Sequence, residues 1–244
     1  MGFSFFFKNR NQNLFEGLTD IHNHILPYID DGSKNIDMSI EMIKEYKELG
    51  VKKIIPTPHI YKSLYPNDPE TILNSFSKLS KKYKNSDLII DSYAAEYMVD
   101  EFFLKNLKNK ESFLLLNNEL ILVEINFFSE TEILEHACFE LSKQRILPLL
   151  AHPERYHMVD SISKYKELKN KGFCFQLNAL SLLGHYGKKV RQKSEEILKH
   201  GLYDYVASDA HNPRHLKILK KLKLSRKLRK HWDSIQEFQK NEFS

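Results

Sequence analysis

The chain has 244 residues, 41% of them hydrophobic and 28% charged, which is the balance of one soluble globular domain with a substantial core. The formal net charge of +5 is spread along the chain, and its densest stretch, residues 217–230, is interpreted as a solvated helix face rather than a nucleic-acid site. The two cysteines, Cys138 and Cys174, do not make a disulfide framework and suit a reducing cytoplasm.

The N-terminus begins with the apolar run Met1-Gly-Phe-Ser-Phe-Phe-Phe, which is too short for a signal peptide or a membrane span. No longer apolar stretch follows it. We therefore expect residues 1–16 to be an extension that packs on the surface or stays loose, and residues 17–244 to form a single domain. We also expect no membrane span and a cytoplasmic location.

Short β-type runs alternate with helix-length segments from residue 18 onward. The β-type runs are Leu18–Ile25, Lys53–Thr57, Leu88–Ala94, Leu120–Ile125, Ile146–Ala151, Phe173–Leu177 and Tyr205–Ser208. The helix-length segments are Ile36–Leu49, Pro69–Lys84, Glu130–Lys143, Ser161–Lys171, Lys188–His200 and Pro213–Leu222. This alternation predicts a parallel sheet, and seven units without a linker favour a closed or nearly closed barrel. An open doubly wound sheet is the alternative.

Metal-binding residue types collect where these strands end. The carboxyl ends of the strands of a βα barrel form one rim, and chemistry is placed there. Six of the seven runs end in histidines or carboxylates, at Asp20-Ile-His22-Asn-His24, Thr57-Pro-His59, Ala95-Glu96, Val123-Glu124, Ala151-His152-Pro-Glu-Arg155 and Asp209-Ala-His211. The remaining run, the sixth along the chain, offers the polar residues Gln176 and Asn178.

Two of these ends carry metal-binding residues at a spacing of two. Residues i and i+2 of a strand point to the same face, so His22 and His24 can reach one ion, and so can Asp209 and His211. Imidazole and carboxylate ligands suit zinc, manganese or iron. One such pair could be two exposed histidines, and one buried acid could be a satisfied core group. Six such ends favour a metal site, because buried acids are costly unless they are paired.

Several segments resemble one family. The stretch Asp20-Ile-His-Asn-His-Ile-Leu-Pro-Tyr-Ile-Asp-Asp-Gly-Ser33 is similar to the opening motif of the bacterial PHP-domain protein-tyrosine phosphatases. These are the CpsB/CapC/YwqE-type enzymes tied to capsule and exopolysaccharide synthesis. The similarity continues in the same order, over about residues 18 to 223, through Thr57-Pro-His59, Ala95-Glu96, Val123-Glu124, Ala151-His-Pro-Glu-Arg155, Gln176-Leu-Asn178 and Ser208-Asp-Ala-His-Asn212.

The resemblance implies a distorted (β/α)7 TIM-like barrel of the PHP type. It also implies two or three divalent metal ions, usually manganese, with iron and zinc as alternatives. The ligands implied by motif position are His22, His24, Asp31, His59, Glu96, Glu124, His152, Asp209 and His211. Asp31 is preferred to its neighbour Asp30. Arg155 and Arg214 occupy places where the family has phosphate-binding arginines, and His211 is also a candidate proton donor.

The implied reaction is hydrolysis of phosphotyrosine in a protein by a metal-activated hydroxide that attacks phosphorus in line. The implied partner is the tail of a bacterial tyrosine kinase. A phenolate leaving group, with a pKa near 10, lessens the need for a strong general acid. The residues argue against a cysteine nucleophile, because Gln144 and Leu180 stand where a C-x5-R loop starting at Cys138 or Cys174 would need arginine.

Two rival functions stay open at this stage. The first is a PHP enzyme acting on a small phosphomonoester such as histidinol phosphate, with the same metals and a different pocket. The second is a non-catalytic metal-binding regulatory module that has kept the barrel. A PHP nuclease or proofreading domain is disfavoured, because the chain has no polymerase portion and no concentrated basic groove. The sequence thus predicts a metal-dependent phosphoester hydrolase, and its phosphotyrosine specificity rests on the resemblance.

Overall fold

The computed structural model describes residues 13–84, 87–126 and 132–243 of the chain. Its strands are β1 (Thr19–Asp20), β2 (Lys53–Ile54), β3 (His59–Ile60), β4 (Glu96–Met98), β5 (Leu120–Glu124), β6 (Leu147–Ala151), β7 (Cys174–Asn178) and β8 (Tyr205–Ala207). Its α-helices are α1 (Ile36–Glu48), α2 (Pro69–Lys82), α3 (Glu101–Lys108), α4 (Glu132–Lys143), α5 (Ile162–Asn170), α6 (Lys188–Lys199), α7 (Pro213–Leu219) and α8 (Arg226–Glu242). Two short 3-10 helices, η1 (Pro153–Arg155) and η2 (Ala179–Leu183), follow β6 and β7.

The strands form a parallel barrel of seven chain segments. Strand β1 pairs with β2, and β3 to β8 pair in sequence order, every pair being parallel. Strands β2 and β3 are two parts of one extended segment. The ring closes where the backbone N–H of Asp209 donates to the carbonyl of His22 at 2.8 Å and that of His24 donates to Ala210 at 3.0 Å. The predicted distorted (β/α)7 barrel is confirmed.

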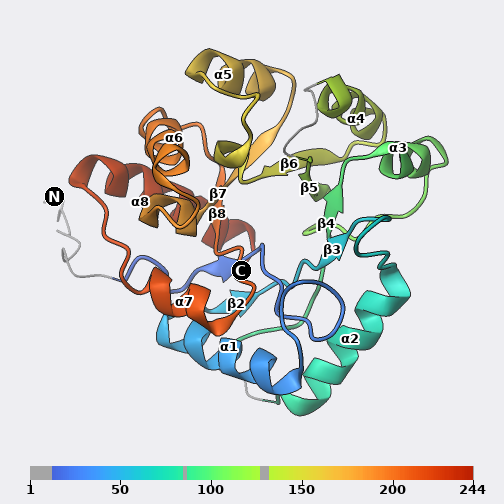
Figure 1. Ribbon diagram of the computed structural model, residues 1–244, viewed down its shortest axis with the longest axis vertical. Helices are drawn as coiled ribbons and strands as arrows, with labels where there is room; N and C mark the ends of the chain where they lie inside the picture. The colour runs from blue at the N-terminus through green and yellow to red at the C-terminus, as the bar shows by residue number, and fades with distance from the viewer. Residues whose placement is uncertain (1–12, 85–86, 127–131, 244) are drawn as a thin grey trace, which may run out of the picture.

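The helices surround this ring, with the strands toward the middle (Figure 1). Strand β5 shows why the strands lie inside, since all five of its residues, Leu-Ile-Leu-Val-Glu, are buried. Such continuous apolar runs are typical of parallel strands that are covered on both faces. The helices begin at polar caps: the side chain of Asn35 accepts from the backbone N–H of Met38, and that of Asp68 from Thr71.

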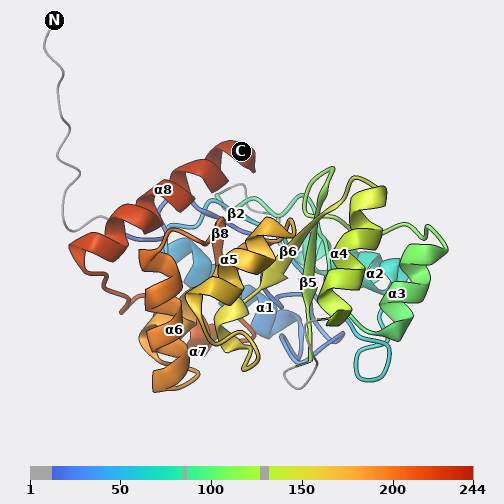
Figure 2. The same cartoon turned by 90° about the horizontal axis from the view of Figure 1, so that it is seen from above.

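Helix α8 lies across the end of the barrel where the strands begin (Figure 2). The side-chain amide of Gln239 donates to the carbonyls of Thr19 in β1 and Val206 in β8, at 2.7 and 2.9 Å. The opposite end, where the strands finish, is therefore left to the loops that follow them. None of the helices in the described part of the chain has the length and apolar character needed to cross a membrane.

The last residues of the expected extension pack against α8. Leu14 and Phe15 are buried, and the Phe15 ring meets the Trp232 ring of α8 edge-on with centroids 5.5 Å apart. The carbonyl of Leu14 accepts hydrogen bonds from the side chains of Trp232 and Gln236. These residues belong to the core because α8 supplies a partner surface for them. Residues 1–12 of the expected extension lie outside the described residues.

Three expectations needed correction. The run Leu88–Ala94 pairs with β2 only through the single bridge Ile89–Lys53, and the strand itself is Glu96–Met98. Helix α3 was not predicted; it is short, begins at the cap Asp100 and buries only Phe103 and Leu107. Residues 217–230 are not one helix face, because α7 ends at Leu219 and α8 begins at Arg226. Residues 130 and 131 of the expected helix Glu130–Lys143 lie outside the described residues.

Candidate metal centre

The first strand segment delivers two buried histidines to the carboxyl rim. The side chains of His22 and His24 are completely buried, and their Nε2 atoms both lie 3.4 Å from Oδ1 of Asp209. Asn23, between them, points the other way, and its side-chain amide donates to the carbonyls of Asp20 and Ile55. The alternation expected from a strand therefore places both imidazoles on the inner face.

Glu96, the first residue of β4, lies at the centre of the cluster. Its Oε2 is 3.2 Å from Nε2 of His22 and 3.0 Å from Nδ1 of His59, and its Oε1 is 3.3 Å from Nε2 of His152. Glu124, at the end of β5, reaches the same His59 Nδ1 at 3.1 Å. Five strand segments thus place polar side chains in one buried volume.

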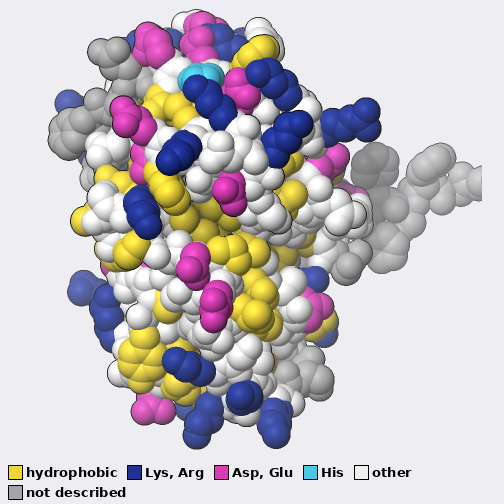
Figure 3. Space-filling view, turned by 90° about the vertical axis from the view of Figure 1, so that its right-hand side faces the viewer, with side chains coloured by type: hydrophobic (Ala, Val, Ile, Leu, Met, Phe, Trp, Pro, Cys, Tyr) yellow, Lys and Arg dark blue, Asp and Glu magenta, His cyan; other side chains and the backbone are white. Residues whose placement is uncertain are grey.

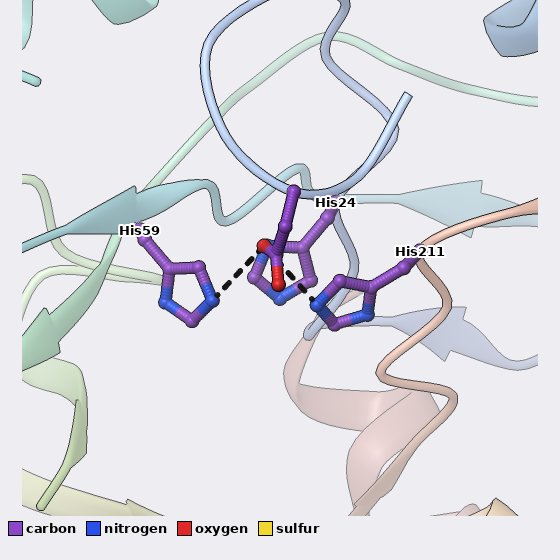
Figure 4. Close-up of side chains that lie close together, drawn as sticks. His24, His59 and His211 are labelled. Atoms are coloured by element: carbon purple, nitrogen blue, oxygen red, sulfur yellow. Dashed lines mark ion pairs between the residues drawn. The ribbon is translucent and has the colours of Figure 1, made fainter. Parts of the chain in front are cut away.

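Asp31 comes to the cluster from the loop that follows the first strand segment. Its Oδ1 lies 3.5 Å from Nε2 of both His59 and His211, and Figure 4 shows these imidazoles on opposite sides of the carboxylate with His24 between them. The loop folds back on itself, since the N–H of Ser33 donates to the carbonyl of His24. Gly32 permits this close approach, because a Cβ there would lie 2.1 Å from that carbonyl oxygen.

Asp30 has a different position from its neighbour Asp31. Its Oδ2 accepts from Nδ1 of His24 at 2.9 Å and from the backbone N–H of His59 at 3.2 Å, and its Oδ1 accepts from Gly32. The Asp30 carboxylate is therefore fully used in orienting His24, whose Nε2 is left facing the cluster. This geometry supports Asp31 rather than Asp30 as the ligand.

The donor set fits divalent metal ions. Four overlapping groups have ligand atoms within 4.8 Å of one another: His24, Asp31, His59 and His211; His22, His24 and Asp209; His22, Glu96 and His152; and His59, Glu96 and Glu124. Within the described part of the chain, buried atoms without a hydrogen-bond partner include Nε2 of His22 and His24, Nδ1 of His59 and both carboxylate oxygens of Glu96. Buried polar atoms are nearly always satisfied, so their concentration at one point indicates that cations complete the site.

The ionisation of the cluster leads to the same conclusion. Although burial opposes it, the charges of His22 and His59 hold the pKa of Glu96 well below its usual range. Burial and the charge of His59 disfavour protonation of His24, yet the carboxylates of Asp30 and Asp209 raise its pKa to about 10. Without metal, protons on the imidazoles therefore balance the carboxylates. A divalent cation that bound here would displace those protons.

Polar residues behind the cluster fix its geometry. The side chain of Gln176, in β7, accepts from His22 Nδ1 at 2.9 Å and from the backbone N–H of His152 at 3.3 Å. Glu154, completely buried, accepts from the backbone of Asn178 and from the hydroxyls of Ser181 and Tyr203. Sequence reasoning noted that Gln176 and Asn178 were polar but gave Glu154 no role of its own. Glu154 lies within the segment His152-Pro-Glu-Arg155 that resembles the family, and this was the sequence feature that could have indicated a role for it.

The cluster opens into a pocket of about 590 Å³. Arg155 lines it, with Nη1 3.2 Å from Oδ2 of Asp209 and the guanidinium 4.3 Å from the ring of Tyr186. Arg214 is the second residue of α7; it is exposed and is not one of the lining residues, whereas the next residue, His215, is. The structure thus brings the expected ligands and Arg155 together, and does not bring Arg214 into the pocket. Tyr65 and Tyr186 are lining residues that the sequence reasoning missed.

The cysteines take no part in this site. Cys138 is buried in α4, and burial raises the pKa of its thiol. Cys174 is the first residue of β7, where burial and the charge of Asp204 raise its pKa to about 11. Neither lines the pocket, and a nucleophilic cysteine needs a depressed pKa. Cys138 is a buried helix residue, whereas Cys174 is only partly buried in its strand.

The fold and the cluster define a βα barrel with a metal centre at its carboxyl rim, the arrangement of metal-dependent hydrolases. A lactonase from Listeria monocytogenes and an amidohydrolase from Mycoplasma synoviae share this fold, with TM-scores of 0.50 and 0.51 at 12% and 14% identity. They cover 95% and 93% of this chain and are covered over 92% and 87% of their own. At this level of identity, these two similarities establish the fold alone.

The chain belongs to the CpsB/CapC family of capsular polysaccharide synthesis, whose sequence pattern matches residues 18–234. It is 32% identical to CapC of Staphylococcus aureus, over 92% of this chain and 89% of that one. It is 30% identical to the tyrosine-protein phosphatase YwqE of Bacillus subtilis, over 80% and 78%. A chain from the crystal structures of YwqE and of CpsB from Streptococcus pneumoniae, described as unique metal-dependent tyrosine phosphatases, superposes with a TM-score of 0.75 at 28% identity, over 92% and 95% of the two chains.

Proposed function

We propose that this protein is a metal-dependent tyrosine-protein phosphatase. The observation that carries the proposal is the buried cluster of histidines and carboxylates, with unsatisfied ligand atoms, at the base of a pocket that Arg155 also lines. Family membership supports the same activity, because YwqE and CpsB are described as metal-dependent tyrosine phosphatases. Histidinol phosphate hydrolysis and a non-catalytic role gain no support from these comparisons.

We propose that two or three divalent cations bind, with the ligand set His22, His24, Asp31, His59, Glu96, Glu124, His152, Asp209 and His211. The four overlapping groups support more than one ion. Nitrogen and oxygen donors without thiolate suit manganese, and also iron or zinc. When bound, such cations supply charge neutralisation for the phosphoryl group and activation of a water molecule.

The protein's own residues orient the proposed metal ligands and neutralise the charge of the phosphoryl group. Arg155 can present its guanidinium to the phosphoryl oxygens, a planar group suited to two parallel hydrogen bonds. Asp30 and Gln176 accept from Nδ1 of His24 and His22, so each ring directs its Nε2 into the cluster. These contacts hold the ligand atoms in place before substrate arrives.

His211 was expected to be both ligand and proton donor. Its Nδ1 lies 3.0 Å from the carbonyl of Asp209, which can only accept a hydrogen bond, so the ring atom that faces the cluster is Nε2, 3.5 Å from Oδ1 of Asp31. One atom cannot bind a cation and carry a proton at once. We assign Nε2 to the metal, because a phenolate leaving group, with a pKa near 10, departs with little help from an acid.

The proposed substrate is a phosphotyrosine protein, and the proposed partner is the tyrosine-bearing tail of a bacterial tyrosine kinase, in the cytoplasm. The test is hydrolysis of a phosphotyrosine peptide by the metal-free protein after addition of manganese, iron or zinc, with histidinol phosphate as the rival substrate. Turnover of the peptide that needs added metal is expected. Strong preference for histidinol phosphate, or no turnover of any phosphomonoester, would overturn the proposal.

A further inference from the structure

The pocket has two chemically different sides. Arg155, Tyr186 and His215 line the side formed after β6 to β8. The side formed after β3 to β5 is lined mainly by apolar or aromatic side chains, those of Tyr61, Leu64, Tyr65, Met98 and Ile125, together with the polar Asn126. The ligand atoms of the cluster lie between the two sides. A phosphate ester held at the cluster would therefore have a cationic neighbour on one side and an apolar one on the other.

The turn Tyr61–Tyr65, between β3 and α2, is held firmly at the pocket. The backbone N–H of Tyr61 donates to the carbonyl of Tyr65 at 2.9 Å, and the reverse bond measures 2.8 Å. The side-chain amide of Asn67 donates to the carbonyls of His59 and Ile29, both at 2.8 Å. The turn is thus tied to the strand that carries His59 and to the loop that carries Asp31.

Two side chains of this turn are placed in ways that folding alone does not require. Leu64 is 65% exposed although it lines the pocket. Folding therefore buries little of its hydrophobic surface. The Tyr65 ring lies nearly parallel to the His59 ring, at 11° and 5.2 Å between centroids. Tyr65 therefore continues the surface of a proposed metal ligand toward the pocket opening.

Apolar side chains also reach the surface beyond the pocket. On the face to the right of Figure 1, which carries α2 and α3, hydrophobic side chains lie near the middle and basic ones are spread around them (Figure 3). Leu73 of α2 is also exposed, at 45%, and it does not line the pocket. Leu73 therefore gives a matched control for Leu64.

We propose that Leu64 and Tyr65 form a platform that binds the aromatic ring of the substrate's ester group. This inference rests on the proposed function and names the specificity determinant within it. An aryl phosphate places a flat apolar ring directly beside its phosphoryl group, and such a ring would cover Leu64 and pack against Tyr65. An alkyl phosphate such as phosphoserine has no ring to make these contacts. The platform therefore selects aryl over alkyl phosphate esters.

The platform contacts the ring equally in the ground state and the transition state, so its loss should weaken binding and leave kcat largely unchanged. The test uses two non-hydrolysable inhibitors of phosphotyrosine-peptide hydrolysis, phenylphosphonate and methylphosphonate. In Leu64→Ser we expect the inhibition constant for phenylphosphonate to rise about threefold to tenfold, the size of one such contact. The constant for methylphosphonate should not change.

Tyr65→Ala should have the same selective effect, and Tyr65→Phe should restore wild-type inhibition because it keeps the ring. Bound metal is measured in each variant, because Tyr65 touches His59. Leu73→Ser should alter neither constant. Equal inhibition of wild type and Leu64→Ser by phenylphosphonate would overturn the platform while leaving the phosphatase assignment intact. A wild-type protein without phosphomonoesterase activity would overturn the assignment itself.

Discussion

Nδ1 of His22 lies 2.9 Å from Oε1 of Gln176, which joins the first strand segment to the middle of β7. A hydrogen bond from Nδ1 to Gln176 leaves Nε2 of His22 as the ring atom that would bind a cation in the cluster. We expect Gln176→Leu to weaken metal binding about tenfold to a hundredfold, the usual effect of removing a partner behind a metal ligand. Titration of the metal-free variant with manganese, followed by activity, measures this. Gln176→Glu keeps an acceptor and is the control, and unchanged affinity in the leucine variant would refute the role of Gln176.

Removal of metal should lower stability as well as activity. Among the described residues, several buried imidazole nitrogens of the cluster and both carboxylate oxygens of Glu96 make no hydrogen bond, so bound cations should stabilise the folded state by about 2.7 kcal/mol when metal is present at a hundred times its dissociation constant. Thermal unfolding with a chelator, and again after manganese is restored, measures the shift. The double variant His22→Ala, His24→Ala should lose activity, bind less metal and show a smaller shift. Wild-type turnover in that variant would contradict the site.

Arg155 and Arg214 should differ in their effect on catalysis. Arg155 lines the pocket, so Arg155→Ala should reduce kcat/KM about a hundredfold to a thousandfold, as loss of one donor to a transition-state oxyanion does. Arg155→Lys should recover only part of this, because an ammonium lacks the planar fork. Arg214 is exposed and outside the lining, so Arg214→Ala should have a smaller effect. Equal losses would show that Arg214 reaches the substrate, as the family resemblance implies.

Glu154 should make stability depend on pH. Burial raises the pKa of this carboxyl, so the folded chain holds the proton more tightly than the unfolded chain. The free energy of unfolding should therefore fall as pH rises from the ordinary glutamate pKa, about 4.3, to the folded value. Glu154→Gln removes this contribution, so its stability relative to wild type should improve as pH rises above the ordinary glutamate pKa.

Urea unfolding of both proteins at acid and alkaline pH, with metal chelated, measures the Glu154 effect. A difference between the two proteins that did not vary with pH would contradict it. Glu154→Ala is the second variant. It leaves the donors of Asn178, Ser181 and Tyr203 without their acceptor, which should cost about 1–3 kcal/mol for each group that stays buried and unpaired.

Phe15 should matter for folding although it lies before the first strand. Phe15→Ala removes a buried ring that packs on Trp232 and should reduce the free energy of unfolding by about 3 kcal/mol. Deleting residues 1–12 removes none of the described contacts and should have a much smaller effect. Chemical denaturation of both variants compares them. A negligible effect of Phe15→Ala would contradict a contribution of this contact to stability.

The amino-acid sequence by itself determined the kind of barrel and most of the residues at its rim. Alternating apolar strands and helices fix a parallel arrangement, and parallel strands must end at the same rim, so His22, Glu96 and Asp209 were expected together without coordinates. The spacing of two between His22 and His24 fixed their common face, because side chains alternate along a strand. These are local rules, and they act over a few residues.

Only the tertiary structure decided which residues form hydrogen bonds or ring contacts with those rim residues. Asp30 and Asp31 are adjacent in sequence, and the fold of one loop over Gly32 gives the first to His24 and the second to the cluster. Gln176, Glu154 and Tyr65 acquire their roles through contacts between segments far apart in the chain. Arg214 lies outside the pocket for a similar reason, because its position on α7 leaves its side chain exposed to solvent. Loop paths depend on packing against distant elements, which no local pattern of residues specifies.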